Sequence, residues 1–487
     1  MTSPHSIFWF RNDLRLDDNP GLFEACKAGE VLAIYIHDDQ SPADWSMGGA
    51  SRVWLHHSLS DLQQRLDGKL HVYSGSPIEV LSRLIDSYQI DNLYWNRCYE
   101  PWCITRDTAI KSMLTQRQVT VTSYNAALLW EPWTVVKSDG TPYKVFTPYY
   151  RRGCLSRPSP REPLPAPDLN KIVLLANEPT AIDTLGLLSG RPWESEIISQ
   201  WNIGELAAKQ RLGIFINHRI HQYKEQRNYP AEAGVSNLSP HLHFGEISPH
   251  TIWHFTAQSL MQSQSEEDVD CFLSEIAWRE FSYYLLYHFP ELPAQNLQPR
   301  FDRFPWSDTP DDTLLLWKLG KTGFPIVDAG MRELWQTGYM HNRVRMIVGS
   351  FLVKNLLIDW RLGQAWFWDC LFDADLASNS AGWQWIAGCG ADAAPYFRIF
   401  NPVTQGEKFD AHGSYVRQYV PELAALPDKY IHAPWTMPDT LAQELNFKKG
   451  TDYPDPIVDL KDSRARALEA FSTLKTAPSA EDIKTAS

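Results

Sequence analysis

Four short segments of the chain bring together the side chains best suited to bind a ligand and to carry out chemistry. They combine aromatic rings, arginines, carboxylates and amides at the spacing of helices or turns, and they run over Ser274–Phe281, Gly338–Met346, Asp373–Trp385 and Asp392–Pro402. Polar groups of this kind are costly to bury unless they find partners. Their density beside aromatic side chains therefore suggests a cavity for a large, polar and planar ligand.

The chain contains twenty tryptophans and has a formal net charge of −13. A single tryptophan is most simply a core residue, but such an excess suggests a role in stacking or electron transfer. The negative charge does not favour a protein that is basic over its whole surface. It still allows a local basic groove, because salt screens distant acidic groups.

The cysteines predict neither a disulfide framework nor a zinc site, because they are odd in number, scattered, and form no C-x-x-C motif. They are Cys26, Cys98, Cys103, Cys154, Cys271, Cys370 and Cys389. Reduced thiols suit the cytoplasm. The N-terminus has no signal-like pattern, and no apolar run reaches the length of a membrane span. We therefore expect a cytoplasmic monomer with no membrane partner.

The first part of the chain is predicted to form alternating strands and helices. Apolar, strand-like runs are separated by amphipathic segments of helical length such as Ala50–Leu66 and Ile78–Tyr88, and these runs are Ile7–Phe10, Val31–Ile36, Leu70–Tyr73, Asn92–Trp95 and Val119–Ser123. Pro20 and Pro77 stand where helices would begin, since the first turn needs no proline N–H. This alternation predicts a mainly parallel sheet covered by helices, although the Gly-rich dinucleotide motif is absent.

The rest of the chain changes character twice. Prolines cluster at Pro158, Pro160, Pro163, Pro165 and Pro167, which predicts a linker over residues 131–200. Helical periodicity then dominates, as in Asp268–Tyr287 and Gly330–Leu357. We therefore expect an α/β + all-α protein with a doubly wound parallel-sheet domain over residues 1–130, an all-helical domain over 201–474, and a frayed tail over 475–487.

The sequence resembles the photolyase/cryptochrome family over nearly its whole length. Trp9–Leu16, followed by Asp18–Pro20, fits the opening strand of that family, and Trp366–Asp410 is similar to its flavin-binding core. The resemblance implies an N-terminal α/β antenna domain, a long linker and a C-terminal helical FAD-binding domain. It also implies a DNA photolyase, a carbon–carbon lyase that splits cyclobutane pyrimidine dimers in UV-damaged DNA with light and reduced FAD.

The resemblance assigns FAD-binding roles to Tyr223, Val235, Ser236, Asn237, Leu238, Ser239, Arg279, Arg345, Asp373, Asp375 and Asn379. The loop 235–239 is expected to hold the phosphates and ribose, where backbone N–H groups and a serine hydroxyl suit phosphate oxygens. The family often has Thr in place of Val235. Arg345 and Asp373 are expected to form an ion pair beside the flavin ring. The neutral amide of Asn379 is expected to face flavin N5.

Roles in electron transfer and DNA binding are carried over in the same way. Electron hopping is expected to pass through Trp383, nearest the flavin, then Trp360 and Trp306, nearest the surface. The dimer pocket is expected to comprise Glu275, Trp278, Asn342, Arg343, Met346 and Trp385, with Glu275 assisting catalysis. Contacts to DNA phosphates are expected from Arg227, Arg343, Arg398 and Gln405.

Several alternatives stay open beside this interpretation. Repair of (6-4) photoproducts needs a proton donor, and family members with that activity carry histidine at the position of Met346. Methionine cannot donate a proton, so this activity is disfavoured. A cryptochrome photoreceptor is the main alternative, and a flavin electron carrier is a further one. The antenna cofactor is expected to be 5,10-methenyltetrahydrofolate, with 8-hydroxy-5-deazaflavin as the alternative, since Cys103 stands where some folate-binding members have glutamate.

Overall fold

The computed structural model describes residues 4–260, 265–308, 311–393, 395–396 and 398–476. The chain divides into two compact units. The first unit comprises Met1–Tyr223, Ser236–Pro290 and Phe372–Ala377, and the second comprises Lys224–Val235, Glu291–Leu371 and Ser378–Ser487. Within the described residues, no helix combines the length and the apolar character needed to cross a bilayer.

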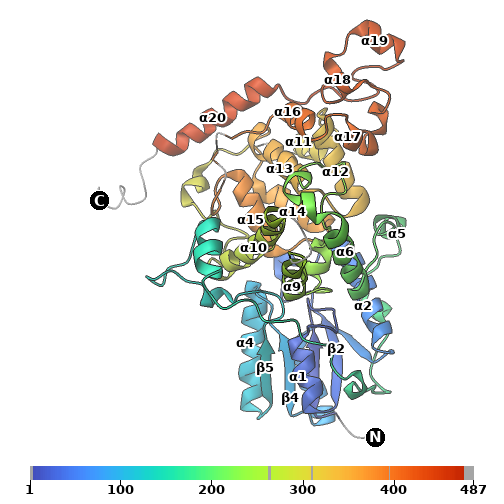
Figure 1. Ribbon diagram of the computed structural model, residues 1–487, viewed down its shortest axis with the longest axis vertical. Coiled ribbons are helices and arrows are strands. Elements are labelled where there is room, and N and C mark those ends of the chain that lie inside the picture. The colour runs from blue at the N-terminus through green and yellow to red at the C-terminus, as the bar shows by residue number, and fades with distance from the viewer. Residues whose placement is uncertain (1–3, 261–264, 309–310, 394, 397, 477–487) are drawn as a thin grey trace. The chain divides into compact units, whose positions relative to one another are not determined.

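A five-stranded parallel sheet forms the core of the first unit (Figure 1). The strands lie in the order β3-β2-β1-β4-β5, and their bounds are β1 Ser6–Phe10, β2 Val31–His37, β3 Leu70–Ser74, β4 Asn92–Asn96 and β5 Thr120–Tyr124. The helices between them are α1 (Pro20–Ala28), α2 (Gly49–Arg65), α3 (Pro77–Tyr88) and α4 (Pro101–Gln116). The predicted doubly wound sheet is confirmed, and α1 and α3 begin at the prolines that predicted them.

Side chains of successive strand residues enter two separate cores, because the side chains of a strand alternate between its faces. Phe8 and Phe10 pack with α1, α2 and residues of the predicted linker such as Ile182. Ile7 and Trp9 pack on the opposite face with α3 and α4. Since both faces of the sheet are covered, the central strands β1 and β2 are almost wholly apolar, whereas the edge strand β5 is mostly polar.

The predicted linker packs on the sheet of the first unit instead of standing free. Val173 N donates to Val31 O at 3.0 Å, and Val72 N donates to Pro179 O at 2.9 Å. The linker contains short helical segments at Pro132–Thr134, Pro148–Cys154, Leu169–Lys171 and Ile182–Leu185, with α5 at Pro192–Ile197. The limits predicted for the linker and its neighbouring domains stay predictions.

Helices make up the rest of the chain. In the first unit they are α6 (Glu205–His218), α8 (Ser239–His243), α9 (Pro249–Ser259) and α10 (Glu266–His288). The others are α7 (Tyr223–Gln226), α11 (Asp311–Lys318), α12 (Pro325–Thr337), α13 (Asn342–Ser350), α14 (Trp360–Cys370), α15 (Leu376–Ala387), α16 (Pro402–Phe409), α17 (Ser414–Tyr419), α18 (Asp428–Ile431), α19 (Asp439–Glu444) and α20 (Leu460–Thr476). Helix α20 reaches two residues into the predicted tail, and residues 477–487 lie outside the described residues.

The periodic stretch Gly330–Leu357 is not one helix. Gly338 adopts a left-handed conformation with φ +65°, and it ends α12. Such a φ suits glycine and breaks the helical hydrogen-bond pattern. The chain restarts as α13, and a π-helical turn follows at Phe351–Asn355. The predicted helical periodicity is thus divided between two α-helices and a π-helical turn.

Glu280 on α10 ties this helix to the segment that follows β5. Its carboxylate accepts from Leu129 N at 2.7 Å and from Trp130 N at 3.3 Å, and the residue is 1% exposed. Burial raises the pKa of Glu280 to about 7, although the Arg279 guanidinium and these N–H groups oppose the shift.

We expect Glu280→Gln to remove a pH-dependent loss of stability. An acid whose pKa is raised by folding holds its proton more tightly in the folded protein, so the free energy of unfolding falls as pH rises from 4.5 toward about 7. At about 1.4 kcal/mol per pKa unit, the loss approaches roughly 3 kcal/mol. Denaturant unfolding at pH 5 and pH 8 should show this slope in the parent and a flatter one in the variant. The exposed Glu79→Gln is the control, and equal slopes in parent and Glu280→Gln would contradict the assignment.

Candidate functional site

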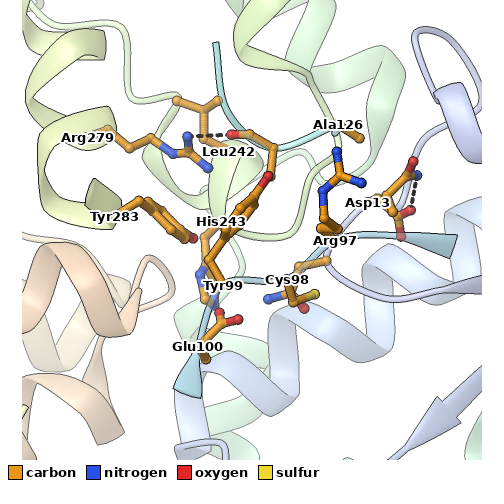
Figure 2. A pocket seen from close by; sticks show the side chains of 13 residues that line it. Asp13, Arg97, Cys98, Tyr99, Glu100, Ala126, Leu242, His243, Arg279 and Tyr283 are labelled. Atoms are coloured by element: carbon orange, nitrogen blue, oxygen red, sulfur yellow. Dashed lines mark hydrogen bonds between the residues drawn. The ribbon is translucent and has the colours of Figure 1, made fainter. Parts of the chain in front are cut away.

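A hollow opens in the first unit where the strand order reverses, between the carboxyl ends of β1 and β4. Its lining includes Asp13 after β1 and the run Arg97–Glu100 after β4. Residues of α8 and α10 complete it, and Figure 2 shows Arg279 and Tyr283 on one side with Asp13, Arg97 and Cys98 on the other. We call it the switch-point hollow. In parallel α/β sheets this position is the usual place for a ligand.

The loop before α15 places two of the expected FAD residues in the first unit. Asp373 and Asp375 are 9% and 7% exposed, and Tyr283 on α10 donates its hydroxyl to Asp375 Oδ2. Burial lowers the pKa of His243, and the two carboxylates oppose that shift. Tyr283 and His243 were not predicted from the sequence, because each meets these acids from a distant part of the chain.

Helix α10 carries three of the predicted site residues along its length. Arg279 donates to Ala127 O at 2.7 Å, and its guanidinium lies 4.8 Å from the ring centre of Tyr283. Trp278 is half-buried and stacks on Phe146, with ring centroids 3.8 Å apart. One face of this indole is therefore covered by the protein. Glu275 is half-buried one turn earlier on the same helix.

The expected phosphate-binding loop leads into α8, which starts at Ser239. Asn237 has a left-handed φ of +52°, and its buried Oδ1 makes no hydrogen bond within the described ranges. Ser236 Oγ accepts from Leu238 N at 3.4 Å. Leu238 is buried, and Ser239 is exposed.

The other two residues expected in this region flank the loop. Tyr223 is buried against Phe215 and Phe272 in the first unit. Val235 is half-buried and belongs to the second unit.

Asn379 on α15 has a fixed amide orientation in the second unit. Its Nδ2 donates to the backbone oxygen of Gln364 at 3.1 Å. Because that partner is a carbonyl, the donating atom must be the NH₂ group. The amide oxygen of Asn379 is thereby left as the atom that can accept a hydrogen bond. Gln364 also donates to Ser380 Oγ at 2.8 Å, and it was not predicted from the sequence.

Trp383 occupies a tight slot in the second unit. It is 2% exposed and packs edge-on against Phe367 at 5.0 Å and Trp317 at 6.3 Å between ring centroids. A Cβ atom added at Gly363 would lie 2.2 Å from Trp383 Cη2, so only glycine leaves room for the indole. Trp317 is fully buried and was not predicted from the sequence.

The other two residues of the expected hopping chain differ in burial. Trp360 begins α14, is fully buried, and donates its Nε1 hydrogen to Asn296 Oδ1 at 3.0 Å. Trp306 is half-buried and lies against Phe304, with ring centroids 4.4 Å apart. Trp306 is therefore the most exposed of the three tryptophans, and the electron path through them stays a prediction.

Positive charge gathers in the second unit around Arg343, despite the net charge of −13 for the chain. The pKa of Arg343 is lowered first by burial and then by the charges of Arg227 and Arg398. Its guanidinium hydrogen-bonds to Asn228 Oδ1 and lies 4.4 Å from the ring centre of Phe409. We call Arg227, Arg343 and Arg398 the arginine cluster. The structure thus brings together three residues expected at DNA phosphates.

Four more of the predicted DNA contacts, Asn342, Met346, Trp385 and Gln405, lie in the same unit, whereas Glu275 and Trp278 belong to the first unit. Met346 Sδ is 3.8 Å from Arg343 Nη1, and Asn342 is exposed at the start of α13. Gln405 on α16 and Trp385 on α15 are half-buried.

Some expected pairings stay predictions. Arg345 belongs to the second unit, where its Nε donates to Met340 O at 2.7 Å, and Asp373 belongs to the first. In the predicted segment Asp392–Pro402, residues 394 and 397 lie outside the described residues.

Comparison with known proteins gives matches over almost the whole chain. A family model described as DNA photolyase matches residues 6–168, and one described as the FAD binding domain of DNA photolyase matches residues 272–473. The chain is 44% identical over 474 residues to a deoxyribodipyrimidine photo-lyase of Agrobacterium fabrum, covering 96% of this chain and 98% of that protein. It is 38% identical over 488 residues to cryptochrome-1 of Arabidopsis thaliana, covering 96% and 70%.

A solved structure is similar over the same length. The crystal structure of a bacterial class III photolyase from Agrobacterium tumefaciens superposes with a TM-score of 0.92 and 43% sequence identity. The match covers 98% of this chain and 99% of that one.

Proposed function

The chain belongs to the DNA photolyase family, and from this membership we propose that it is a light-driven photolyase that splits cyclobutane pyrimidine dimers in DNA. The family resemblance found in the sequence is confirmed, as is a domain of the FAD-binding type. The proposal for the substrate rests on the arginine cluster of the second unit, on Trp278 and Glu275 of the first unit, and on the reaction named for its relatives.

The arginine cluster is the observation that carries the proposal. The pKa of Arg343 is lowered by burial and then by the charges of Arg227 and Arg398, so both of these arginines act on Arg343 electrostatically. A group of cationic side chains attracts an anion such as a phosphate. The phosphates on either side of a flipped-out dimer would supply that anion without any reading of base sequence.

The residues expected to hold FAD fit its chemistry. The Asn379 amide presents an oxygen that can accept a hydrogen from a ring N–H, and Asn237 Oδ1 is a buried acceptor that could receive a ribose hydroxyl. Reduced FAD, when bound, supplies under light the electron that opens the cyclobutane ring and takes it back afterwards. Trp278 would offer a flat apolar face to the dimer, and Glu275 would bond to a pyrimidine edge.

Two residues favour dimer repair over the alternatives. Met346 has no proton to donate, so the proton transfer needed to repair a (6-4) product has no donor at this position. Asn379 is neutral, and an amide cannot exchange a proton with the flavin as an aspartic acid could. A cryptochrome photoreceptor stays the second candidate, since the plant cryptochrome is 38% identical.

We also propose an antenna pigment at the carboxyl edge of the sheet, with methenyltetrahydrofolate favoured over a deazaflavin. Trp9 is 1% exposed, and the guanidinium of Arg106 lies 4.9 Å from the centre of its ring. Trp9 Nε1 and Arg11 Nε make no hydrogen bond to any described residue, so this edge has buried donors to offer. The absorption spectrum of pigment released from the purified protein would distinguish the two compounds. Reduced cysteines are consistent with a cytoplasmic enzyme.

The deciding experiment is repair of UV-treated oligonucleotide under blue light after chemical reduction of the flavin. We expect dimers to disappear in the light and to persist in darkness. A cryptochrome would bleach and recover its flavin absorption while leaving every dimer intact, and that result would reject the photolyase proposal.

A further inference from the structure

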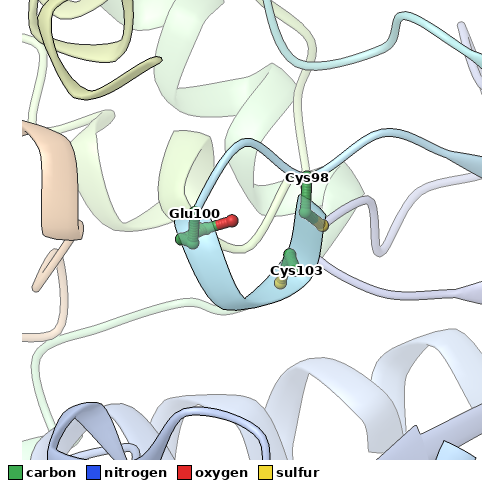
Figure 3. Close-up of side chains that lie close together, drawn as sticks. All are labelled: Cys98, Glu100 and Cys103. Atoms are coloured by element: carbon green, nitrogen blue, oxygen red, sulfur yellow. The ribbon is translucent and has the colours of Figure 1, made fainter. Parts of the chain in front are cut away.

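Two cysteines and a carboxyl group meet at the first turn of α4 (Figure 3). The sulfur atoms of Cys98 and Cys103 and a carboxylate oxygen of Glu100 all lie within 4.8 Å of one another. Glu100 is the N-cap residue of α4, so Cys98 precedes the helix and Cys103 lies in its first turn. The cysteines are five positions apart, and the turn at the start of α4 brings them together.

The two thiols are not equivalent. Cys103 is 7% exposed, and its pKa is raised by a hydrogen bond with Cys98 and by burial. Cys103 therefore keeps its proton and donates it to the Cys98 sulfur. Cys98 is half-buried and lines the switch-point hollow. Cys98 is thus the accessible sulfur, and Cys103 is the protected partner behind it.

Two arginines lie near the pair, and both are ion-paired: Arg11 with Asp107, and Arg106 with Asp107 and Asp38. The guanidinium groups of Arg11 and Arg106 both interact electrostatically with Cys98 and Cys103. Neighbouring cations stabilise the thiolate, which is the reactive form of cysteine. The three groups offer one ligand atom each, whereas a zinc ion in tetrahedral coordination needs a fourth ligand. The cluster is therefore better suited to thiol oxidation than to metal binding.

Glu100 supplies a proton-carrying group beside both sulfurs. The residue is 8% exposed, and its Oε2 makes no hydrogen bond within the part of the chain that the structure describes. Burial raises the pKa of Glu100, and the Asp375 carboxylate adds to the shift. An unpartnered carboxyl group at this distance can receive a proton from one thiol and return it to a leaving oxygen.

We propose that Cys98 and Cys103 form an oxidation site at which a hydroperoxide converts the two thiols into a disulfide. The Cys98 thiolate attacks one peroxide oxygen, the O–O bond breaks, and the leaving oxygen departs as water (or alcohol) after protonation through Glu100. Cys103 then attacks the sulfenic sulfur, the S–O bond breaks, and a second water leaves. Two thiols are oxidised and one peroxide is reduced, so electrons and atoms balance.

The surroundings select a small oxidant. The switch-point hollow has room for about one or two water-sized molecules, which suits hydrogen peroxide and excludes a bulky disulfide reagent. The new S–S bond would close a ring across the N-cap of α4 and restrain Glu100. Because Glu100 interacts electrostatically with Asp375, oxidation would alter the charge environment of a residue expected at the flavin.

Peptide mapping of the full flavin-containing protein tests the site. In darkness, hydrogen peroxide is added stepwise, and free thiols are then alkylated. Trypsin cleaves after Arg97 and Arg106, so a single fragment carries both cysteines and no others. We expect this fragment to lose two hydrogen atoms and both alkylation sites together, about tenfold faster than Cys271 reacts.

Variants separate the roles of the two sulfurs. Cys103→Ser should accumulate a sulfenic acid on Cys98 that dimedone traps, and Cys98→Ser should leave Cys103 unreacted. Cys271→Ser, which removes another half-buried thiol, should behave like the parent. Oxidation of Cys98 without loss of the Cys103 thiol in the parent would overturn the proposal, as would one zinc ion per chain that protects the pair. The parent result decides the matter even if a Cys103 variant fails to fold.

Discussion

Replacing Trp383 with phenylalanine is expected to lower the rate at which light reduces oxidised FAD by at least about tenfold, equivalent to roughly 1.4 kcal/mol in barrier height. A benzene ring gives up an electron far less readily than an indole, while the change keeps most of the apolar contact with Phe367 and Trp317. Repair by the chemically reduced protein should persist, because the flavin is then already reduced and needs no electron from the tryptophans. The variant thus separates reduction of the cofactor from repair of DNA.

Loss of flavin absorbance under continuous illumination, with an external reductant present, measures the first effect. Dimer repair after dithionite treatment measures the second. Trp95→Phe is the matched control, since Trp95 is also 2% exposed but lies in the sheet of the first unit. Equal photoreduction in Trp383→Phe and the parent would remove Trp383 from the electron path.

Replacing Arg343 with alanine is expected to weaken binding to dimer-containing DNA by about 10- to 100-fold, the range for loss of charge-assisted hydrogen bonds. Arg343 is held between Asn228 and the Phe409 ring, so its fork is oriented before DNA arrives. The slope of log affinity against log salt should also fall by about one, as one phosphate contact is lost.

Binding should be measured in darkness by titration at several salt concentrations, with damaged and undamaged duplex. Arg343→Lys is the informative comparison, because lysine keeps the charge but lacks the planar fork. It should retain the salt slope and recover only part of the affinity. An unchanged affinity and slope in Arg343→Ala would show that the arginine cluster does not contact DNA phosphates.

The sheet could be predicted from the sequence almost to the residue. Parallel strands buried on both faces are continuous apolar runs, so Val31–Ile36 and Leu70–Tyr73 reappear as β2 and β3 with one added residue each. The break inside the periodic stretch Gly330–Leu357 could not be predicted, because a glycine inside a periodic pattern is compatible with helix. Only the surrounding packing decides that Gly338 turns left-handed and ends α12.

The candidate site was harder to predict than the fold. The family resemblance identified individual site residues, but it did not identify the hydrogen-bond partners that orient them. Tyr283 and Asp375 are 92 positions apart, and Asn379 is oriented by a backbone oxygen whose position no side-chain pattern reports. The contact between Cys98 and Cys103 could not be predicted either, although they are close in sequence, because it depends on the residue at which α4 begins.

The position of the Trp383 indole depends on Gly363, a residue that takes no part in electron transfer itself. A single methyl group there would collide with the indole of Trp383 and push it aside, leaving its chemical identity untouched. Gly363→Ala would therefore test the position of the indole, whereas Trp383→Phe tests its chemical identity. Natural relatives could be sorted by the same criterion, since a larger residue at this place would require the tryptophan to adopt another pose.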